Sequence, residues 1–411
     1  MRQKYFSLLG ASLAFPLFFT TRLTVYNGDA TSNEFSLPLG LFVTLVCFSA
    51  FGWRSIFSFS RPGPVFLLGG LTLVSLGALF QIGVGDWSLF LIYYIPAVVG
   101  FFVAWTVKIE SDEATRAIFV GFALAAVSAA SLHLTASFVS FGLAGAYAVR
   151  GEDSIFGIFS IYQKYIYYAT ILAFGFFLVL FFFEGLMRWF GALVLVADIL
   201  LVGSREAIVL VIVFWLACSF AQKRSLINSF FLLVTVLPAV GLILFTFYFF
   251  MREHLEDVVF IAKILDIFNS SDASTLSAGR LDTIVDVTNA FNIDGWFLFF
   301  GSGFRTDIGE LGTPHNQYVE WFLRGGIFFV LTNIFILCAS IYRYFVTGGR
   351  INYAAGVLLL SALVICNNIN TPFRVPYTGV FLWFLIGLSF KPSVFRLRAS
   401  QNLKNISVNH I

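Results

Sequence analysis

The sequence predicts an all-α polytopic membrane protein with about 12 transmembrane helices and one long extracytoplasmic loop that contains short amphipathic helices. The first observation is composition: of 411 residues, 59% are hydrophobic and only 11% are charged, and the mean hydropathy is +0.89. A soluble domain carries about 25% charged residues. The second is that the apolar runs reach the roughly 20 residues that a helix needs to cross a bilayer, without the alternation typical of barrel strands. The third is a single long polar stretch, residues 251–318, between such runs.

Composition also limits the classes of partner. The net charge is only +3 and the basic residues are scattered, so we expect no nucleic acid partner. All four cysteines lie inside apolar runs, which favours small core residues over a disulfide framework or a metal site. We therefore expect no metal and no cofactor. The cysteines are Cys47, Cys218, Cys338 and Cys366.

The apolar runs divide the chain into four parts. Residues 1–250 are predicted to form transmembrane helices 1 to 9, residues 251–315 an extracytoplasmic catalytic loop, residues 316–390 helices 10 to 12, and residues 391–411 a cytoplasmic tail. The first run has no convincing cleavage site, so we expect a retained helix rather than a signal peptide. The predicted spans are 5–25, 36–53, 64–82, 88–106, 117–139, 161–183, 187–203, 205–221, 229–250, 316–345, 352–370 and 376–390.

The distribution of Lys and Arg predicts the orientation. With the N-terminus in the cytoplasm, the larger share of the 25 basic residues falls on the cytoplasmic side, as the positive-inside rule requires. Both termini are then cytoplasmic and the polar stretch is extracytoplasmic. The seventh and eighth spans meet at Gly203–Glu206 with almost no loop, so we expect the polar residues of this turn, including Arg205, at an aqueous face.

The polar stretch is predicted to contain two short amphipathic helices, over residues 253–268 and about 281–291. Arg280 stands at the beginning of the second, where a cation opposes the helix dipole unless an anion binds there. The alternative is an ordinary interfacial ion pair between Arg280 and Asp282 or Glu256.

The start of the tenth span carries further candidate residues. Thr313 as N-cap and Pro314 at the first helical position would place His315 in the first turn, at the extracytoplasmic face. A helix N-terminus disfavours the imidazolium, so His315 could accept a proton from a hydroxyl group, or it could simply hydrogen-bond a loop carbonyl. Asn316, Glu320 and Arg324 follow at four-residue intervals. Glu320 and Arg324 are expected to form a structural i, i+4 pair well inside the bilayer, unless they contact substrate.

Taken together, these segments resemble the O-antigen ligase and polymerase superfamily. The resemblance covers residues 190–345 and rests on the order of short motifs rather than on any one of them. Arg324 departs from the pattern, in which an acidic or neutral residue is expected before the glycines. The motifs are Gly203-Ser204-Arg205-Glu206-Ala207, Gly279-Arg280-Leu281, Phe300-Gly301-Ser302-Gly303, His315-Asn316-Gln317-Tyr318-Val319-Glu320 and Gly325-Gly326.

The resemblance implies a metal-independent glycosyltransferase of the GT-C type in the bacterial inner membrane, with a periplasmic active site. Its donor would be an oligosaccharide on undecaprenyl diphosphate and its acceptor another glycan, with membrane lipids around it and a chain-length regulator as a further partner. Arg205 and Arg280 would bind the donor diphosphate and His315 would activate the acceptor hydroxyl. Asn316, Glu320 and Arg305 are candidate supporting residues.

Three classes of function remain open at this stage, the first of which is a glycan transferase. A polymerase would transfer the glycan to a lipid-linked repeat unit, whereas a ligase would transfer it to the lipid A core; the resemblance favours a polymerase. A lipid-linked sugar transporter or flippase is the alternative from another class, although transporters usually place ionisable residues at the bilayer midplane and show two related halves. A non-catalytic assembly subunit is the third.

Overall fold

The computed structural model describes parts of the chain that fall into two compact units. The first unit comprises residues 1–16, 43–119 and 277–411, and the second comprises residues 17–42 and 120–276. Each unit is considered separately below. The described residues are 2–14, 20–25, 33–38, 96–97, 99–101, 103–107, 109, 111–148, 165–221, 295–301, 316–367, 370–373 and 376–391.

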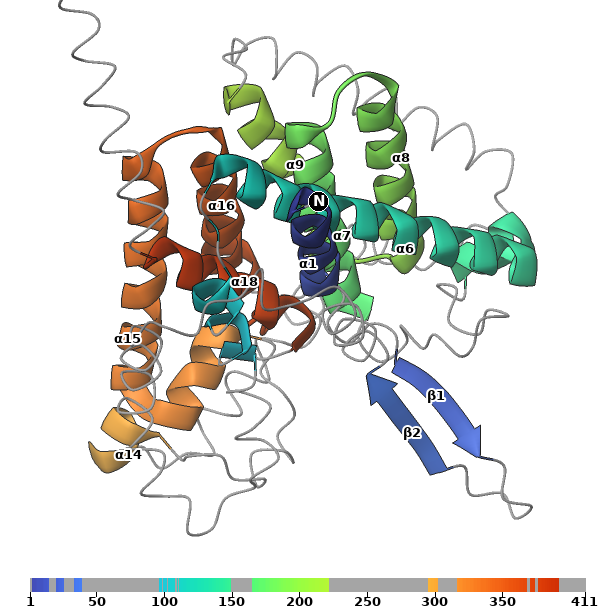
Figure 1. Ribbon diagram of the computed structural model, residues 1–411. Helices are drawn as coiled ribbons and strands as arrows, with labels where there is room; N and C mark the ends of the chain where they lie inside the picture. The colour runs from blue at the N-terminus through green and yellow to red at the C-terminus, as the bar shows by residue number, and fades with distance from the viewer. Residues whose placement is uncertain are drawn as a thin grey trace, which may run out of the picture. The chain divides into compact units, whose positions relative to one another are not determined.

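The second unit is organised around helix α7, Tyr165–Phe182 (Figure 1). Fifteen consecutive residues of α7, from Tyr168 to Phe182, are buried, because α8 (Gly185–Val202) and α9 (Arg205–Ala221) both pack against it. Phe177 of α7 stacks on Phe214 of α9 with ring centroids 4.9 Å apart. Such an all-apolar surface is what a helix inside a membrane bundle requires.

Helix α6, Asp112–Ala148, is long and bends at Gly142, whose φ is 69°. Its residues from 120 onward belong to the second unit. A β-carbon at Gly175 of α7 would lie 2.5 Å from Cβ of Ala126, so this glycine permits the close approach of α6 and α7. The unit also contains an antiparallel strand pair, β1 (Thr20–Val25) and β2 (Asn33–Pro38).

The first unit contains α1 (Arg2–Ala14), α14 (Gly295–Phe300), α15 (Gln317–Thr347), α16 (Arg350–Ser361), the π-helical turn η5 (Ala362–Cys366) and α18 (Pro376–Ser389). Gly348 and Gly349, both with positive φ, reverse the chain between α15 and α16, which pack side by side (Figure 1). Helix α18 is almost completely buried. The Tyr344 hydroxyl of α15 donates a 2.6 Å hydrogen bond to the Leu385 carbonyl of α18, which ties these helices together.

Helix α15 is interrupted at Gly326, which has φ 67° and ψ −168°. This conformation is open essentially to glycine alone. A β-carbon at Gly326 would overlap the backbone of Phe299 in α14, and one at Gly301 would lie 2.7 Å from the nitrogens of Gly325 and Gly326. The short helix α14 and the residue after it therefore sit directly on the bend of α15.

The predicted spans can be compared with the described helices. The spans at 161–183, 187–203, 205–221, 316–345 and 376–390 correspond to α7, α8, α9, α15 and α18 within a few residues. The span at 117–139 lies inside the longer α6, and the span at 352–370 corresponds to α16 with η5. The span at 5–25 is wrong in its second half: the helix ends at Ala14, and residues 20–25 form a strand that pairs with β2. The β-branched sequence Thr20-Thr21-Arg22-Leu23-Thr24-Val25 suits a strand.

The other predicted segments lie wholly or largely outside the described residues. They are the spans at 36–53, 64–82, 88–106 and 229–250, the amphipathic helices of the polar stretch, and the tail after residue 391. Four of the described helices are long and apolar enough to cross a bilayer, namely α6 over residues 112–142, α7, α8 and α15. This indicates a helical, membrane-embedded protein.

Candidate functional site

Arg205 is the first residue of α9, immediately after a tight turn. Gly203 ends α8 in the left-handed conformation, with φ 68° and ψ 35°, and donates to the Ile199 and Leu200 carbonyls. The Ser204 hydroxyl accepts a hydrogen bond from Ala207 N at 3.4 Å, so it caps α9. Arg205 is half-buried. In the part of the chain that the structure describes, no carboxylate forms an ion pair with Arg205.

The residue after Arg205 anchors this helix end to α7. Glu206 is buried, and its Oε1 accepts a 3.4 Å hydrogen bond from the Thr170 hydroxyl. The beginnings of α7 and α9 therefore lie together. The guanidinium of Arg205 is positively charged, and the first backbone N–H groups of α9 carry partial positive charge at the same end. This arrangement suits a phosphate group.

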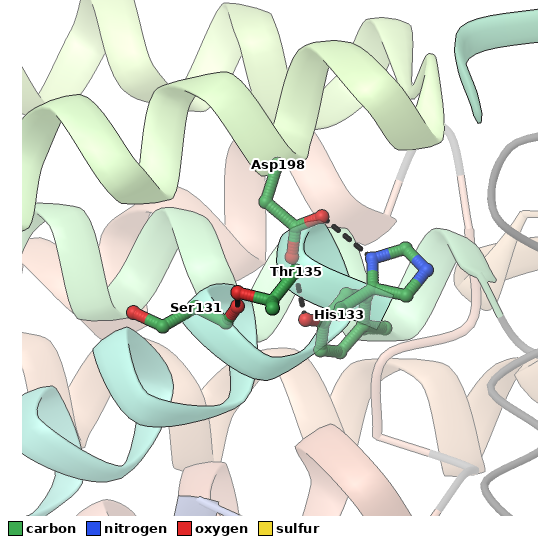
Figure 2. A network of polar contacts seen from close by, with 5 residues as sticks. Ser131, His133, Thr135 and Asp198 are labelled. Atoms are coloured by element: carbon green, nitrogen blue, oxygen red, sulfur yellow. Dashed lines mark hydrogen bonds and ion pairs between the residues drawn. The ribbon is translucent and has the colours of Figure 1, made fainter. Parts of the chain in front are cut away.

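A buried ionisable network lies in the same unit (Figure 2). Asp198 points from α8 toward His133 of α6, and Asp198 Oδ1 lies 2.6 Å from His133 Nδ1. The Tyr168 hydroxyl of α7 donates to the second oxygen, Oδ2, at 2.6 Å. The rings of His133 and Tyr168 meet edge-on, with centroids 5.6 Å apart. Three helices thus contribute one polar side chain each to a common contact.

Burying these polar side chains costs free energy unless they form hydrogen bonds with one another. The side chain of His133 is 7% exposed and that of Asp198 is 0% exposed. Burying a carboxylate that accepts two hydrogen bonds costs less free energy than burying one without partners. Because Asp198 accepts from Nδ1–H in the neutral tautomer, His133 would carry its basic lone pair on Nε2.

The network lies toward the same end of the helices as Arg205. Tyr168 is three residues, or about 4.5 Å, from the start of α7, and Asp198 is four residues, or about 6 Å, from the end of α8. The Gly203 turn then leads directly into α9. Asp198 is therefore only about one helical turn from the end of α8, where Gly203 and Ser204 connect to Arg205.

None of the three network residues was predicted from the sequence. The signal was present, because His133 lies inside the predicted span 117–139 and Asp198 inside 187–203. An ionisable residue within a membrane span indicates a partner on another span.

Asn316 begins α15. Its Oδ1 accepts from Tyr318 N at 2.9 Å and from Val319 N at 3.2 Å, which makes Asn316 the N-cap. The predicted N-cap at Thr313, with Pro314 and His315 in the first turn, is therefore wrong. The side chain of Asn satisfies the first two free N–H groups directly, and the helix begins only at Gln317. His315 precedes the cap in the sequence and lies outside the described residues.

Replacing Asn316 by alanine should lower the free energy of unfolding by about 1 kcal/mol, since two helix N–H groups lose their acceptor. Asn316→Asp should keep most of the stability because its carboxylate can accept the same hydrogen bonds. Thermal unfolding of the purified protein in detergent would measure both variants. Equal stability of Asn316→Ala and the wild type would contradict the capping role.

The predicted pair between Glu320 and Arg324 is present and buried. Arg324 Nε lies 3.4 Å from Glu320 Oε1, and their side chains are 5% and 1% exposed. Both residues also make further contacts. A buried pair held in this way agrees with the expected structural role. The bend at Gly326 follows two residues later and places Gly301 against the turn of α15 that carries Arg324. Two motifs of the resemblance, Phe300-Gly301 and Gly325-Gly326, are thus in contact.

Of the six residues predicted for the site, the structure describes Arg205, Asn316 and Glu320. His315, Arg280 and Arg305 lie outside the described residues, so their convergence with Arg205 stays a prediction. No group of three or more His, Cys, Asp or Glu side chains suited to a metal ion occurs among the described residues. Cys218, Cys338 and Cys366 are not in disulfide bonds.

Comparison of the sequence with protein-family models and with curated proteins gave no match. The resemblance to the O-antigen ligase and polymerase superfamily therefore rests on the motifs themselves.

Proposed function

We propose that the protein is a membrane glycosyltransferase that uses a glycan on a lipid diphosphate as its donor. The observation that carries the proposal is the position of Arg205: a half-buried arginine at the amino end of α9, behind the Gly203 turn, in a helical membrane protein. Guanidinium and helix amide groups together favour a diphosphate. The donor is undecaprenyl diphosphate-linked oligosaccharide and the site faces the periplasm.

In the proposed reaction the acceptor hydroxyl attacks the anomeric carbon of the donor sugar. The bond from this carbon to the diphosphate oxygen breaks, and its electron pair leaves with the diphosphate. Arg205 and Arg280 stabilise the negative charge of the leaving group, and His315 takes the proton of the acceptor hydroxyl. The enzyme needs no nucleotide, because the donor arrives already activated. We favour a polymerase, with a lipid-linked repeat unit as acceptor, over a ligase.

Arg205→Ala should reduce glycan transfer by about 100-fold, because a charge-stabilising group for the leaving diphosphate is lost. Arg205→Lys should recover part of the activity, since an ammonium keeps the charge but not the bidentate geometry. The measurement is incubation of purified protein with lipid-linked repeat units, followed by analysis of product length.

The matched control is Arg188→Ala. Arg188 lies at the beginning of α8, whereas Arg205 follows the turn at the other end of α8. Arg188 Nε donates to the Phe183 carbonyl at 2.7 Å, a local contact. This variant should keep its activity. Full activity of Arg205→Ala would refute the diphosphate role. In cells lacking the protein, single repeats on the lipid A core identify a polymerase, whereas long chains left on the carrier identify a ligase.

A proton-coupled transporter of lipid-linked sugar is the second candidate, and one observation favours it. His133, Asp198 and Tyr168 form a buried ionisable network within candidate membrane spans, as in proton relays of transporters. In proteoliposomes, a transporter would move lipid-linked sugar across the bilayer without extending it, and Asp198→Asn would stop this movement. Chain growth without movement supports the transferase.

A further inference from the structure

Three buried amide side chains gather beside the first turn of α15. Gln317 Nε2, Asn367 Nδ2 and Asn370 Nδ2 donate no hydrogen bond, although the residues are only 0%, 0% and 1% exposed. Buried donors without acceptors are rare in native proteins, and each one calls for an explanation. We call Gln317, Asn367 and Asn370 the amide cluster.

Hydrogen bonds hold the amide cluster in place through its acceptor atoms. Gln317 Oε1 accepts from Phe373 N at 3.1 Å, and Asn370 Oδ1 accepts from Thr371 N at 2.9 Å. Asn370 N in turn donates to the Cys366 carbonyl at 2.7 Å. The first of these hydrogen bonds joins the beginning of α15 to Phe373, and the other two fix the position of Asn370. The side-chain N–H groups of Gln317 and Asn370 are left unsatisfied.

Asn367 belongs to the same junction. It follows η5 and lies beside Tyr318, whose hydroxyl donates to the Leu363 carbonyl. Neither the nitrogen nor the oxygen of the Asn367 amide has hydrogen-bonding geometry to a partner. Asn367 can therefore both donate to and accept from a ligand. The adjoining turn η5 is π-helical, and π-helical turns occur frequently at functional sites.

Aromatic rings continue from the amide cluster into the protein. The ring centroids of Trp321 and Phe373 are 5.8 Å apart, and those of Phe373 and Trp383 of α18 are 5.7 Å apart. Trp383 Nε1 is a further buried donor without an acceptor. Aromatic surface with a few convergent polar groups is the usual lining of a small-molecule site.

We propose that the amide cluster is a subsite for a neutral sugar of the acceptor glycan. Amide and indole N–H groups are uncharged donors that suit hydroxyl oxygens, and Asn367 Oδ1 can accept from a hydroxyl. The rings of Trp321, Phe373 and Trp383 can pack against the C–H faces of a pyranose. This inference rests on the proposed function, since Gln317 follows the expected base His315 by two residues.

The test compares Asn367→Leu with Asn352→Leu. Asn352 of α16 is also buried and its Nδ2 also lacks an acceptor, but it lies outside the amide cluster. Replacing an unsatisfied amide by an apolar side chain of similar size should leave thermal stability equal or raised in both variants. The probe is the free repeat-unit oligosaccharide released from the cell's own lipid carrier. The readouts are thermal stabilisation by this probe and KM for the lipid-linked acceptor.

We expect the probe to stabilise the wild type and Asn352→Leu, and to have no effect on Asn367→Leu. KM for the acceptor should rise about tenfold in Asn367→Leu alone, as for the loss of one or two hydrogen bonds. Should Asn367→Leu fail to fold, Trp383→Phe removes a donor and keeps an aromatic ring, and the same loss of stabilisation is expected.

Two outcomes overturn the inference: no stabilisation of the wild type by the probe, or equal stabilisation of Asn367→Leu and the wild type. Failure of the proposed function gives a different result. In that case the probe still stabilises the wild type and not Asn367→Leu, but no glycan is transferred by either protein.

Discussion

Gly326→Ala should destabilise the protein by about 2–5 kcal/mol, the sum of a strained backbone and a steric overlap. At φ 67° and ψ −168° any β-carbon is unfavourable, and here it would also overlap the carbonyl group of Phe299. To remove this overlap, α14 would have to move away from the bend of α15. The expected result is a large fall in the midpoint of thermal unfolding in detergent.

Gly348→Ala is the matched control for this prediction. Gly348 has φ 68° and ψ −174°, almost the same conformation as Gly326, but a β-carbon there would meet no atom within 4 Å. It should cost only the backbone strain, about 1–3 kcal/mol. If both variants lose the same stability, contact between α14 and the bend contributes nothing and the packing described for Gly301 and Gly326 is wrong.

Asp198→Ala should cost about 3–5 kcal/mol, because it leaves the buried His133 and Tyr168 without their common acceptor. Tyr168→Phe should cost less, about 1–3 kcal/mol, since only one hydrogen bond to Asp198 is lost. Thermal unfolding in detergent again provides the measurement, and Asp198→Asn separates the loss of charge from the loss of shape.

The double variant His133→Leu/Asp198→Leu gives the decisive comparison. Replacing both members of a buried pair by apolar side chains is often neutral or stabilising. The double variant should therefore be more stable than Asp198→Leu alone, with a coupling free energy of about 1–3 kcal/mol. Additive effects of the two single changes would show that the 2.6 Å contact does not stabilise the fold.

Hydropathy was sufficient to predict the longer helices that the structure describes, α6 to α9 and α15. The boundary between α8 and α9 was predicted within one residue, because Gly203 and Ser204 are strong end and start signals for helices. The strands β1 and β2 were not predicted, since Leu23 and Val25 lie among other apolar residues and a short apolar run does not distinguish strand from helix. Short α14 was missed for the same reason.

The candidate site was less predictable because it depends on which helix faces pack together. The sequence places Tyr168, Asp198 and His133 on three separate helices, and only packing shows that one carboxylate serves both other groups. The cap at Asn316 was missed because Thr313 and Pro314 form an equally good start signal three residues earlier. The amide cluster was invisible for another reason: asparagine and glutamine are usually exposed, and the sequence does not show which of them lose contact with water.

The bend at Gly326 also divides α15 into two arms of unequal length. The helix has 31 residues and would be about 46 Å long if straight, well beyond the roughly 30 Å of a hydrocarbon layer. The arm after the bend, residues 327–347, is about 31 Å long and matches that thickness by itself. The arm before the bend, with Gln317, Glu320 and Arg324, adds length that a straight crossing of this layer does not need. A guanidinium such as that of Arg324 costs far less free energy near the membrane surface than among the acyl chains, so the bend separates the charged part of α15 from its apolar part.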